Sequence, residues 1–267
     1  MNSNPTIELH QLAIGYKSRH RNIIVAQDIN AQLYAGCMTC LIGPNGVGKS
    51  TLMRTLAAFQ KPMAGGILLQ GKPLEDYSDN MLAKTLSVVL TEKLDVINMT
   101  VRELVGMGRL PYSGFWGTLN KEDGVVVDHA MERVGIMDLA GRRVLTLSDG
   151  ERQKVMIAKA LAQQTPLILL DEPTAFLDYP SKVEILQLMH RLCKEEDKTV
   201  MLSTHDLELA LQIADNLWLL LDDGSLNIGS PRELADSGVL THFIEREGIT
   251  FDRQQLAVVV NNKGAEL

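Results

Sequence analysis

Short apolar runs alternate along this chain with stretches whose apolar residues recur at helical spacing. Residues 87–90 and 167–170 are almost entirely apolar, which is typical of strands that are buried on both faces of a sheet. Comparable strand-sized runs occupy residues 37–42, 199–203 and 216–221, and an opening strand is indicated by Ile7, Leu9 and Leu12. Because such strands alternate with helical stretches, the pattern predicts an α/β fold with a largely parallel sheet.

The middle of the chain follows helical spacing instead. Between about residue 100 and residue 163 the better helical segments are 123–134 and 151–162, and a separate helix is expected at 49–57. A short helical tail is expected after about residue 230, with its last residues loosely held. We therefore predict a single domain over residues 1–267, with an α/β core at about 1–92 and 164–230, an inserted helical subdomain at about 93–163, and a tail at about 231–267.

Composition and charge narrow the class of protein. The 267 residues include 45% hydrophobic and 22% charged side chains, which is an ordinary mixture for a globular protein. Lys and Arg number 26 against 33 Asp and Glu, so the net charge is −7 and a general nucleic-acid binder is not expected. No apolar run approaches the ~18 residues that span a bilayer, and residues 1–10 lack the pattern of a secretory signal. We therefore expect a soluble cytoplasmic protein, which can still associate with a membrane through a partner.

Residues 43–51 carry the strongest chemical signal. They match G-x-x-x-x-G-K-[ST] and lie between a predicted strand and a predicted helix, which is the context of a P-loop. The glycines let backbone N–H groups turn toward phosphate oxygens, and the helix N-terminus favours negative charge there. Lys49 is expected to reach the β- and γ-phosphates, and Ser50 is expected to ligate Mg²⁺. The candidate nucleotide-binding residues are Gly43, Pro44, Asn45, Gly46, Val47, Gly48, Lys49, Ser50 and Thr51.

Two carboxylates follow the apolar run at 167–170. Open α/β sheets bind ligands at the carboxyl ends of their strands. Asp171 is therefore expected to hold Mg²⁺ through water, and Glu172 is expected to orient or deprotonate an attacking water. The alternative is an ordinary strand end that runs into an acidic turn at Pro173. The P-loop upstream favours the catalytic interpretation.

Further motifs, in their order along the chain, resemble the ATP-binding-cassette (ABC) ATPases. Residues 147–153, Leu-Ser-Asp-Gly-Glu-Arg-Gln, look like the signature of that family, which is usually written LSGGQ. Residues 175–178 resemble the loop that joins two cassettes, and residues 203–206 resemble the switch-histidine segment. Tyr16 matches the aromatic residue that stacks on adenine. The resemblance covers about residues 7–231, and it implies a P-loop NTPase (RecA-like) core, an antiparallel β edge subdomain and an inserted helical subdomain.

The resemblance also implies a homodimer that encloses two ATP molecules. In the family the signature of one subunit faces the P-loop of the other, and its residues here are Ser148, Asp149, Gly150 and Glu151. His205 is then expected to contact the γ-phosphate and to act in catalysis with Glu172 and Lys49, while Asp178 couples the two sites. Taken singly, Ser148 could be a simple N-cap, His205 a surface residue and Tyr16 a strand-end aromatic. The joint pattern favours the family roles.

Two regions depart from the family pattern. The family has a glutamine before the helical insertion that contacts Mg²⁺ and water; here Thr91 occupies that position and Glu92 follows, so either is a candidate metal contact. In the signature, Asp149 replaces a glycine and Glu151 replaces a glutamine. A carboxylate near a polyanion is unfavourable, unless it points away or acts as an N-terminal helix charge. We expect hydrolysis to persist with a modified coupling step.

Residues 98–112 indicate which kind of ABC ATPase the chain resembles. They are similar to the ATPases of bacterial importers for iron siderophores, haem and cobalamin, in which this region lines the groove that receives the permease. The resemblance implies ATP and Mg²⁺ as cofactors, multi-spanning permease partners, a separate substrate-binding protein, and a peripheral place on the cytoplasmic side of the cell membrane. One alternative is a soluble P-loop kinase or GTPase, which the signature and His205 disfavour. Another is a non-catalytic ATP-binding regulator, which Thr91 and Asp149 leave open.

Overall fold

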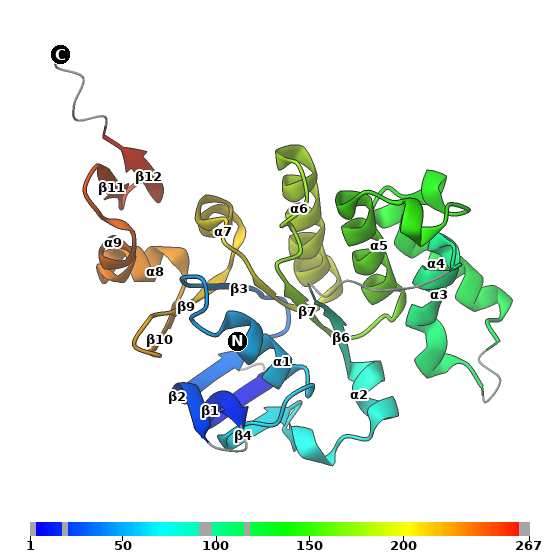
Figure 1. Cartoon of the computed structure of the whole chain (residues 1–267), viewed down its shortest axis with the longest axis horizontal. Helices are drawn as coiled ribbons and strands as arrows, with labels where there is room; N and C mark the ends of the chain where they lie inside the picture. The colour runs from blue at the N-terminus through cyan, green and yellow to red at the C-terminus, as the bar shows by residue number, and fades with distance from the viewer. Residues whose placement is uncertain (1–3, 18–20, 91–97, 115–117, 262–267) are drawn as a thin grey trace.

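The computed structural model describes residues 4–17, 21–90, 98–114 and 118–261 (Figure 1). Its centre is a six-stranded sheet with the strand order β10-β9-β3-β8-β7-β6, in which only the edge strand β10 runs antiparallel to its neighbour. The strands are β3 (Met38–Ile42), β6 (Leu86–Val89), β7 (Leu167–Asp171), β8 (Thr199–Ser203), β9 (Asn216–Leu220) and β10 (Leu226–Gly229). The prediction of an α/β fold with a largely parallel sheet is therefore confirmed.

Strand β7 is buried at every position because it has a hydrophobic core on each face. Leu167 and Leu169 pack in the cluster that holds α1 (Lys49–Leu56). Ile168 and Leu170 pack in the cluster that holds α5 (Asp149–Ala162) and α6 (Tyr179–Glu196). Successive side chains of a strand point to opposite faces, so a strand between two cores needs apolar residues throughout. This explains the unbroken apolar run in the sequence.

A second, antiparallel sheet has the order β2-β1-β4-β5. Its strands are β1 (Ile7–Lys17), β2 (Asn22–Leu33), β4 (Ala64–Leu69) and β5 (Lys72–Pro73). Helix α1 lies between the two sheets, and its Leu52, Met53 and Leu56 are fully buried in the same cluster as Leu9 of β1 and Leu169 of β7. The helix that begins at the P-loop is thus held from both sides.

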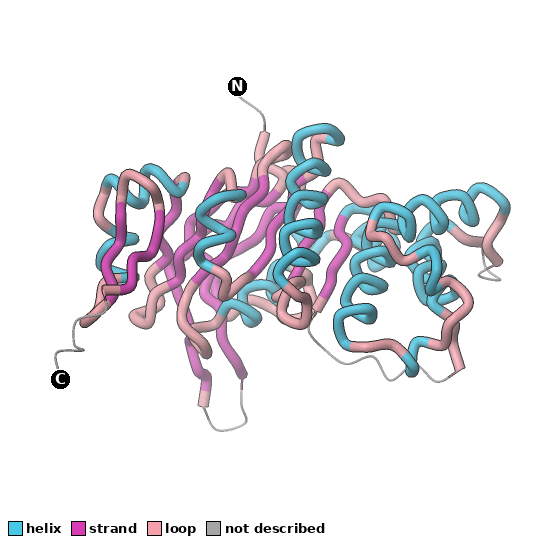
Figure 2. Tube along the Cα trace, turned by 90° about the horizontal axis from the view of Figure 1, so that it is seen from above, coloured by secondary structure: helices cyan, strands magenta, loops and turns pink. Residues whose placement is uncertain are grey.

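Helices α3 (Val101–Gly106), α4 (Lys121–Arg133) and α5 gather at one end of the molecule (Figures 1 and 2). Each begins with a reciprocal capping box, formed by Thr100 with Glu103, Asn120 with Asp123, and Ser148 with Glu151. The other helical segments before residue 230 are α2 (Asp79–Thr85), α7 (Leu207–Ile213) and 3-10 turns at Leu74–Asp76, Met107–Tyr112, Met137–Leu139 and Val144–Thr146. Within the described ranges, no helix combines the length and the apolar character needed to cross a bilayer.

The tail differs from the expected short helical segment. Helices α8 (Pro231–Asp236) and α9 (Val239–Ile244) fit the expectation, but β11 (Ile249–Asp252) and β12 (Ala257–Val260) form an antiparallel hairpin. The helical prediction was therefore wrong for this part. Phe251 is buried while its neighbour Thr250 is exposed, which is the period of two that a strand requires. The hairpin lies at the end of the molecule opposite to the helical insertion (Figure 1).

Candidate active site

The P-loop joins the end of β3 to the start of α1. Gly46 and Gly48 have φ angles of 80° and 117°, in the left-handed region that residues with a side chain rarely adopt. A Cβ at Gly43 would lie 2.3 Å from the backbone oxygen of Leu220 on the neighbouring strand β9. The backbone path of the loop therefore depends on its glycines. This path leads directly into the N-terminus of α1, whose first N–H groups have no partner within the helix.

The side chain of Lys49 is folded into this loop. It is 5% exposed, and its Nζ donates to the backbone oxygens of Gly43 at 2.8 Å and of Pro44 at 2.9 Å. Burial lowers the pKa of Lys49, while the carboxylates of Glu172 and Asp171 act in the opposite direction. An ammonium group in a glycine-rich loop, with carboxylates close by, suits a phosphate chain that carries a divalent cation.

Asp171 and Ser203 end the neighbouring strands β7 and β8, and the parallel register pairs them directly. The Ser203 hydroxyl donates to Asp171 Oδ1 at 2.6 Å and accepts from the backbone N–H of Glu172 at 2.9 Å. Glu172 has a φ of 49°, which is uncommon for a residue with a side chain and typical of functional sites. Both predicted carboxylates thus lie at the carboxyl edge of the sheet. The structure adds Ser203, which the sequence analysis included only as the first residue of the segment 203–206.

His205 meets Glu172 from the segment that follows β8. Its Nε2 contacts Glu172 Oε1, and the two side chains are 44% and 28% exposed. Both line a hollow of about 310 Å³, together with Lys182 and Asp206, whose ion pair measures 2.7 Å. An imidazole in contact with a carboxylate at an open edge can hold a water molecule and move a proton.

Tyr16 lies at the end of β1 beside the P-loop helix. Its side chain is 49% exposed, and its hydroxyl is 2.5 Å from Thr51 Oγ1. This brings the aromatic ring next to the predicted nucleotide-binding residues, while its stacking on adenine stays a prediction. Thr91 and Glu92 lie outside the described residues, so their proposed contact with the metal also stays a prediction.

Ser148 is the N-cap of α5. Its hydroxyl accepts from the backbone N–H of Glu151 at 3.2 Å, and Glu151 Oε2 accepts from the Ser148 backbone N–H at 2.8 Å. Asp149 at the first helical position lies 3.5 Å from Arg152. Both unusual carboxylates of the signature therefore stand at a helix N-terminus, where negative charge is favourable.

The signature packs against the loop at 175–178. A Cβ at Gly150 would lie 3.1 Å from the backbone oxygen of Phe176. Gly150, Glu151 and Asp178 line one hollow of about 320 Å³, whose described lining contains no P-loop residue. Within one chain the signature and Asp178 thus form one surface, and the P-loop with Glu172 and His205 forms another.

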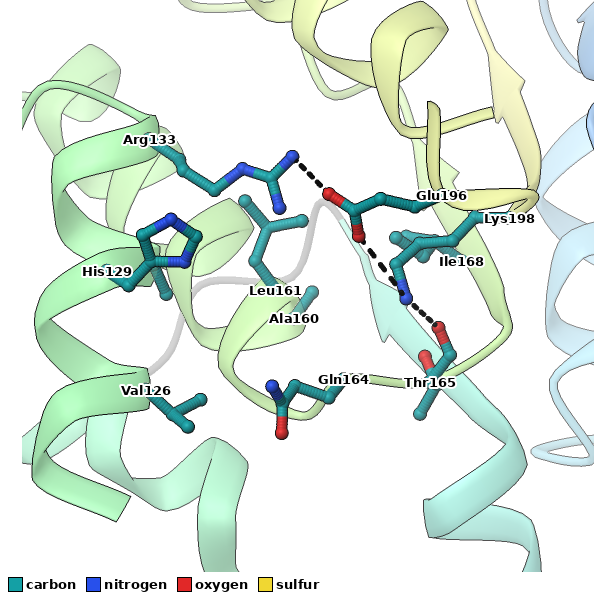
Figure 3. A pocket seen from close by; sticks show the side chains of 11 residues that line it. Val126, His129, Arg133, Ala160, Leu161, Gln164, Thr165, Ile168, Glu196 and Lys198 are labelled. Atoms are coloured by element: carbon teal, nitrogen blue, oxygen red, sulfur yellow. Dashed lines mark hydrogen bonds and ion pairs between the residues drawn. The ribbon is translucent and has the colours of Figure 1, made fainter. Parts of the chain in front are cut away.

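A larger hollow of about 540 Å³ lies where α4 and α5 meet the central sheet (Figure 3). Its charged groups are paired: Arg133 and Lys198 lie 2.6 Å and 3.9 Å from Glu196, and Lys198 Nζ also donates to the backbone oxygen of Thr165 at 2.9 Å. Because Thr165 and Lys198 precede β7 and β8, this hollow lies at the amino edge of the sheet. It is therefore separate from Asp171 and the P-loop, which lie at the carboxyl edge.

Comparisons with known proteins agree with this geometry. A family model described as ABC transporter matches residues 26–175. The chain is 38% identical over 235 residues to the iron(3+)-hydroxamate import ATP-binding protein FhuC of Bacillus subtilis, and the match covers 88% of this chain and 86% of that protein.

Two solved structures share the fold. A dimeric bacterial ABC transporter cassette matches with a TM-score of 0.76 and 27% identity over 84% of this chain and 98% of that chain. A metal-chelate type ABC transporter in an inward-facing conformation matches with a TM-score of 0.75 and 26% identity over 97% of this chain and 96% of that chain. With the P-loop, the paired carboxylates and the signature in place, the chain belongs to the ABC transporter family, as an ATP-binding subunit with ATPase activity.

Proposed function

We propose that this chain hydrolyses ATP to drive an importer for a metal chelate, namely an iron siderophore, haem or cobalamin. Relatives between 34% and 38% identical are named as import ATP-binding proteins for iron(3+)-hydroxamate, petrobactin and cobalamin, or as a transport ATP-binding protein for ferric enterobactin. The similarity of residues 98–112 to that subfamily supports the same class of cargo. The ATPase does not touch the cargo, so the class rests on these resemblances and not on the catalytic residues.

In the proposed mechanism, the P-loop amides and Lys49 hold the phosphate chain. Ser50 is the second residue of α1 and Asp171 ends β7, and their hydroxyl and carboxylate oxygens are the hard ligands that Mg²⁺ prefers. The bound Mg²⁺ would supply neutralisation of the charge that develops on the phosphates. Tyr16 stands beside Thr51, in a position suited to stack on the adenine.

The contact between Glu172 and His205 is the observation that carries the proposal of hydrolysis. Glu172 orients the attacking water and accepts its proton, and His205 faces the γ-phosphate side of that water. The uncommon backbone conformation of Glu172 and its N–H bond to Ser203 hold the carboxylate at this place. A base that is held in position raises the rate of attack, because the water and the base are already in the geometry that the reaction requires.

A second copy of the chain completes each site in this proposal. The surface that holds Gly150 and Asp178, together with Ser148 at the start of the same helix, covers the nucleotide on the P-loop of the other copy, as the dimeric cassette of similar fold suggests. Closure of the two copies on two ATP molecules then moves a membrane permease bound near residues 98–112. The chain is accordingly peripheral on the cytoplasmic side of the membrane, and a separate substrate-binding protein delivers the cargo.

Two experiments test the proposal. Affinity capture of the tagged chain from detergent-solubilised membranes should recover a multi-spanning protein in stoichiometric amount, whereas recovery from the soluble fraction alone would favour the ATP-binding regulator. Glu172→Gln should abolish phosphate release and accumulate a dimer with ATP, because the amide cannot accept the proton of the water. Lys49→Ala is the control, since it should lose ATP binding and stay monomeric. A Glu172→Gln variant that turns over normally would contradict the assigned base.

A further inference from the structure

The carboxylate of Glu151 accepts the only proton that the Ser148 hydroxyl can donate. The Ser148 hydroxyl donates to Glu151 Oε2 at 3.0 Å and at the same time accepts from the Glu151 backbone N–H. In the family the serine of the signature faces a nucleotide held by the second copy. A hydroxyl has only one proton to donate. To donate to a phosphate oxygen, Ser148 must therefore release the Glu151 carboxylate.

The second oxygen of that carboxylate already has a different partner. Arg142 Nη1 donates to Glu151 Oε1 at 2.9 Å, and the two side chains are 43% and 32% exposed. Arg142 Nη2 donates to the backbone oxygen of Thr146 at 2.8 Å, which fixes the direction of the guanidinium. The hydrogen bonds of the capping box and the charge of Arg142 both lower the pKa of Glu151, so the carboxylate is ionised at neutral pH.

The backbone of Arg142 is itself held on both sides. Its N–H donates to the backbone oxygen of Leu139 at 2.9 Å, and its carbonyl oxygen accepts from the N–H of Val101 at 2.9 Å. Val101 begins α3, so this arginine joins the start of α3 to the start of the signature helix α5. The guanidinium is thus placed by a held backbone and by its bond to Thr146, in addition to its pair with Glu151.

We propose that Arg142 is a positioning residue of the signature: it neutralises Glu151, so that the carboxylate yields the Ser148 proton when the nucleotide of a second copy approaches. This inference rests on the proposed function, because it needs the signature to face bound ATP. Without Arg142, the unneutralised carboxylate would be a stronger acceptor for the Ser148 hydroxyl and would also repel the phosphates. A family member with an amide at position 151 has no charge to neutralise, so the requirement is a consequence of the glutamate in this chain.

The test compares three variants in steady-state ATP hydrolysis: Arg142→Gln, Glu151→Gln and the double change. For Arg142→Gln we expect the apparent KM for MgATP to rise about tenfold with a smaller change in kcat, since an unneutralised interface charge opposes association. Higher salt should reduce this defect, because it screens the repulsion. Glu151→Gln sets its own reference KM for a signature with an amide at position 151. The double variant should match that reference, because no charge is left for Arg142 to neutralise.

The double variant separates the electrostatic role from a structural one. Both variants without Arg142 lose its hydrogen bond to Thr146, so an effect of that bond would appear in both and would not be corrected by Glu151→Gln. Arg232→Gln removes a comparable exposed arginine, paired with Asp236 at 3.5 Å in α8, and serves as the matched control with an unchanged KM. A wild-type KM in Arg142→Gln, or a defect that Glu151→Gln does not correct, overturns the inference. If the wild-type chain shows no saturable hydrolysis that depends on Glu172, the proposed function fails and the inference fails with it.

Discussion

Replacing Ser203 with alanine removes one hydroxyl that serves both candidate carboxylates. Ser203 is fully buried, its hydroxyl donates to Asp171 Oδ1 at 2.6 Å, and it accepts from the Glu172 N–H at 2.9 Å. Asp171 is only 3% exposed, and its carboxylate would lose a hydrogen-bond donor. The Glu172 N–H would lose its acceptor. Alanine leaves almost no cavity in place of serine, so the effect comes from these two hydrogen bonds.

The expected loss of stability follows from the two bonds. A hydrogen bond to a charged group contributes about 1.5–3 kcal/mol and a neutral one about 0.5–1.5 kcal/mol, so Ser203→Ala should lower the free energy of unfolding by about 2–4 kcal/mol. Turnover should also fall at least about tenfold, because both carboxylates lose the group that holds them in position.

Urea denaturation measures the change in free energy, and phosphate release measures turnover. The transition midpoint should move to lower urea with an unchanged slope. Ser87→Ala is the matched control: Ser87 is 1% exposed on β6, next to β7, and its hydroxyl has no hydrogen-bond partner among the described residues. Its removal should change the stability by less than about 0.5 kcal/mol or raise it slightly. Equal losses in the two variants, or a loss below about 1 kcal/mol for Ser203→Ala, would refute the role given to this hydroxyl.

Three further predictions concern other parts of the chain. Gly43→Ala should weaken the binding of a fluorescent ATP analogue at least about tenfold, because its Cβ would lie 2.3 Å from the Leu220 oxygen, whereas Gly66→Ala, with open space around the new Cβ, should bind normally. Arg109→Met should lower the free energy of unfolding by about 3–5 kcal/mol, since it leaves the buried Asp123 carboxylate unpaired, and adding Asp123→Asn should restore part of the loss. Burial raises the pKa of Cys40 and of Cys193 to about 12, so above pH 9 the unfolded chain loses thiol protons that the folded chain keeps. The free energy of unfolding should then fall by about 1.4 kcal/mol per pH unit for each thiol. The double alanine variant should show a flatter pH dependence between pH 9 and 11, and an unchanged slope would contradict the assignment.

Features that depend on neighbouring residues could be predicted from the sequence. The apolar runs became the buried strands β3, β7, β8 and β9 because the period of side chains along a strand is local. The P-loop and the pair Asp171–Glu172 were each predicted to follow a strand, and each directly follows a buried strand of the parallel sheet in the structure. The prediction was least accurate for the tail, because its short segments contain too few repeats of the apolar pattern to distinguish a helix from a strand. There the hairpin β11–β12 was taken for a helix.

The sequence by itself thus determined the buried strands of the central sheet and the start of α1 at the P-loop, because these depend on local periodicity and on covalent spacing. Only the tertiary structure decided which side chains meet. The contact of His205 with Glu172, the two bonds of Ser203 and the pairing of Arg142 with Glu151 join residues on different elements. These contacts depend on the register of β7 with β8 and on the packing of the helical insertion, and no local pattern encodes either. The folded chain is therefore needed to show which groups hold the candidate carboxylates and the signature in position.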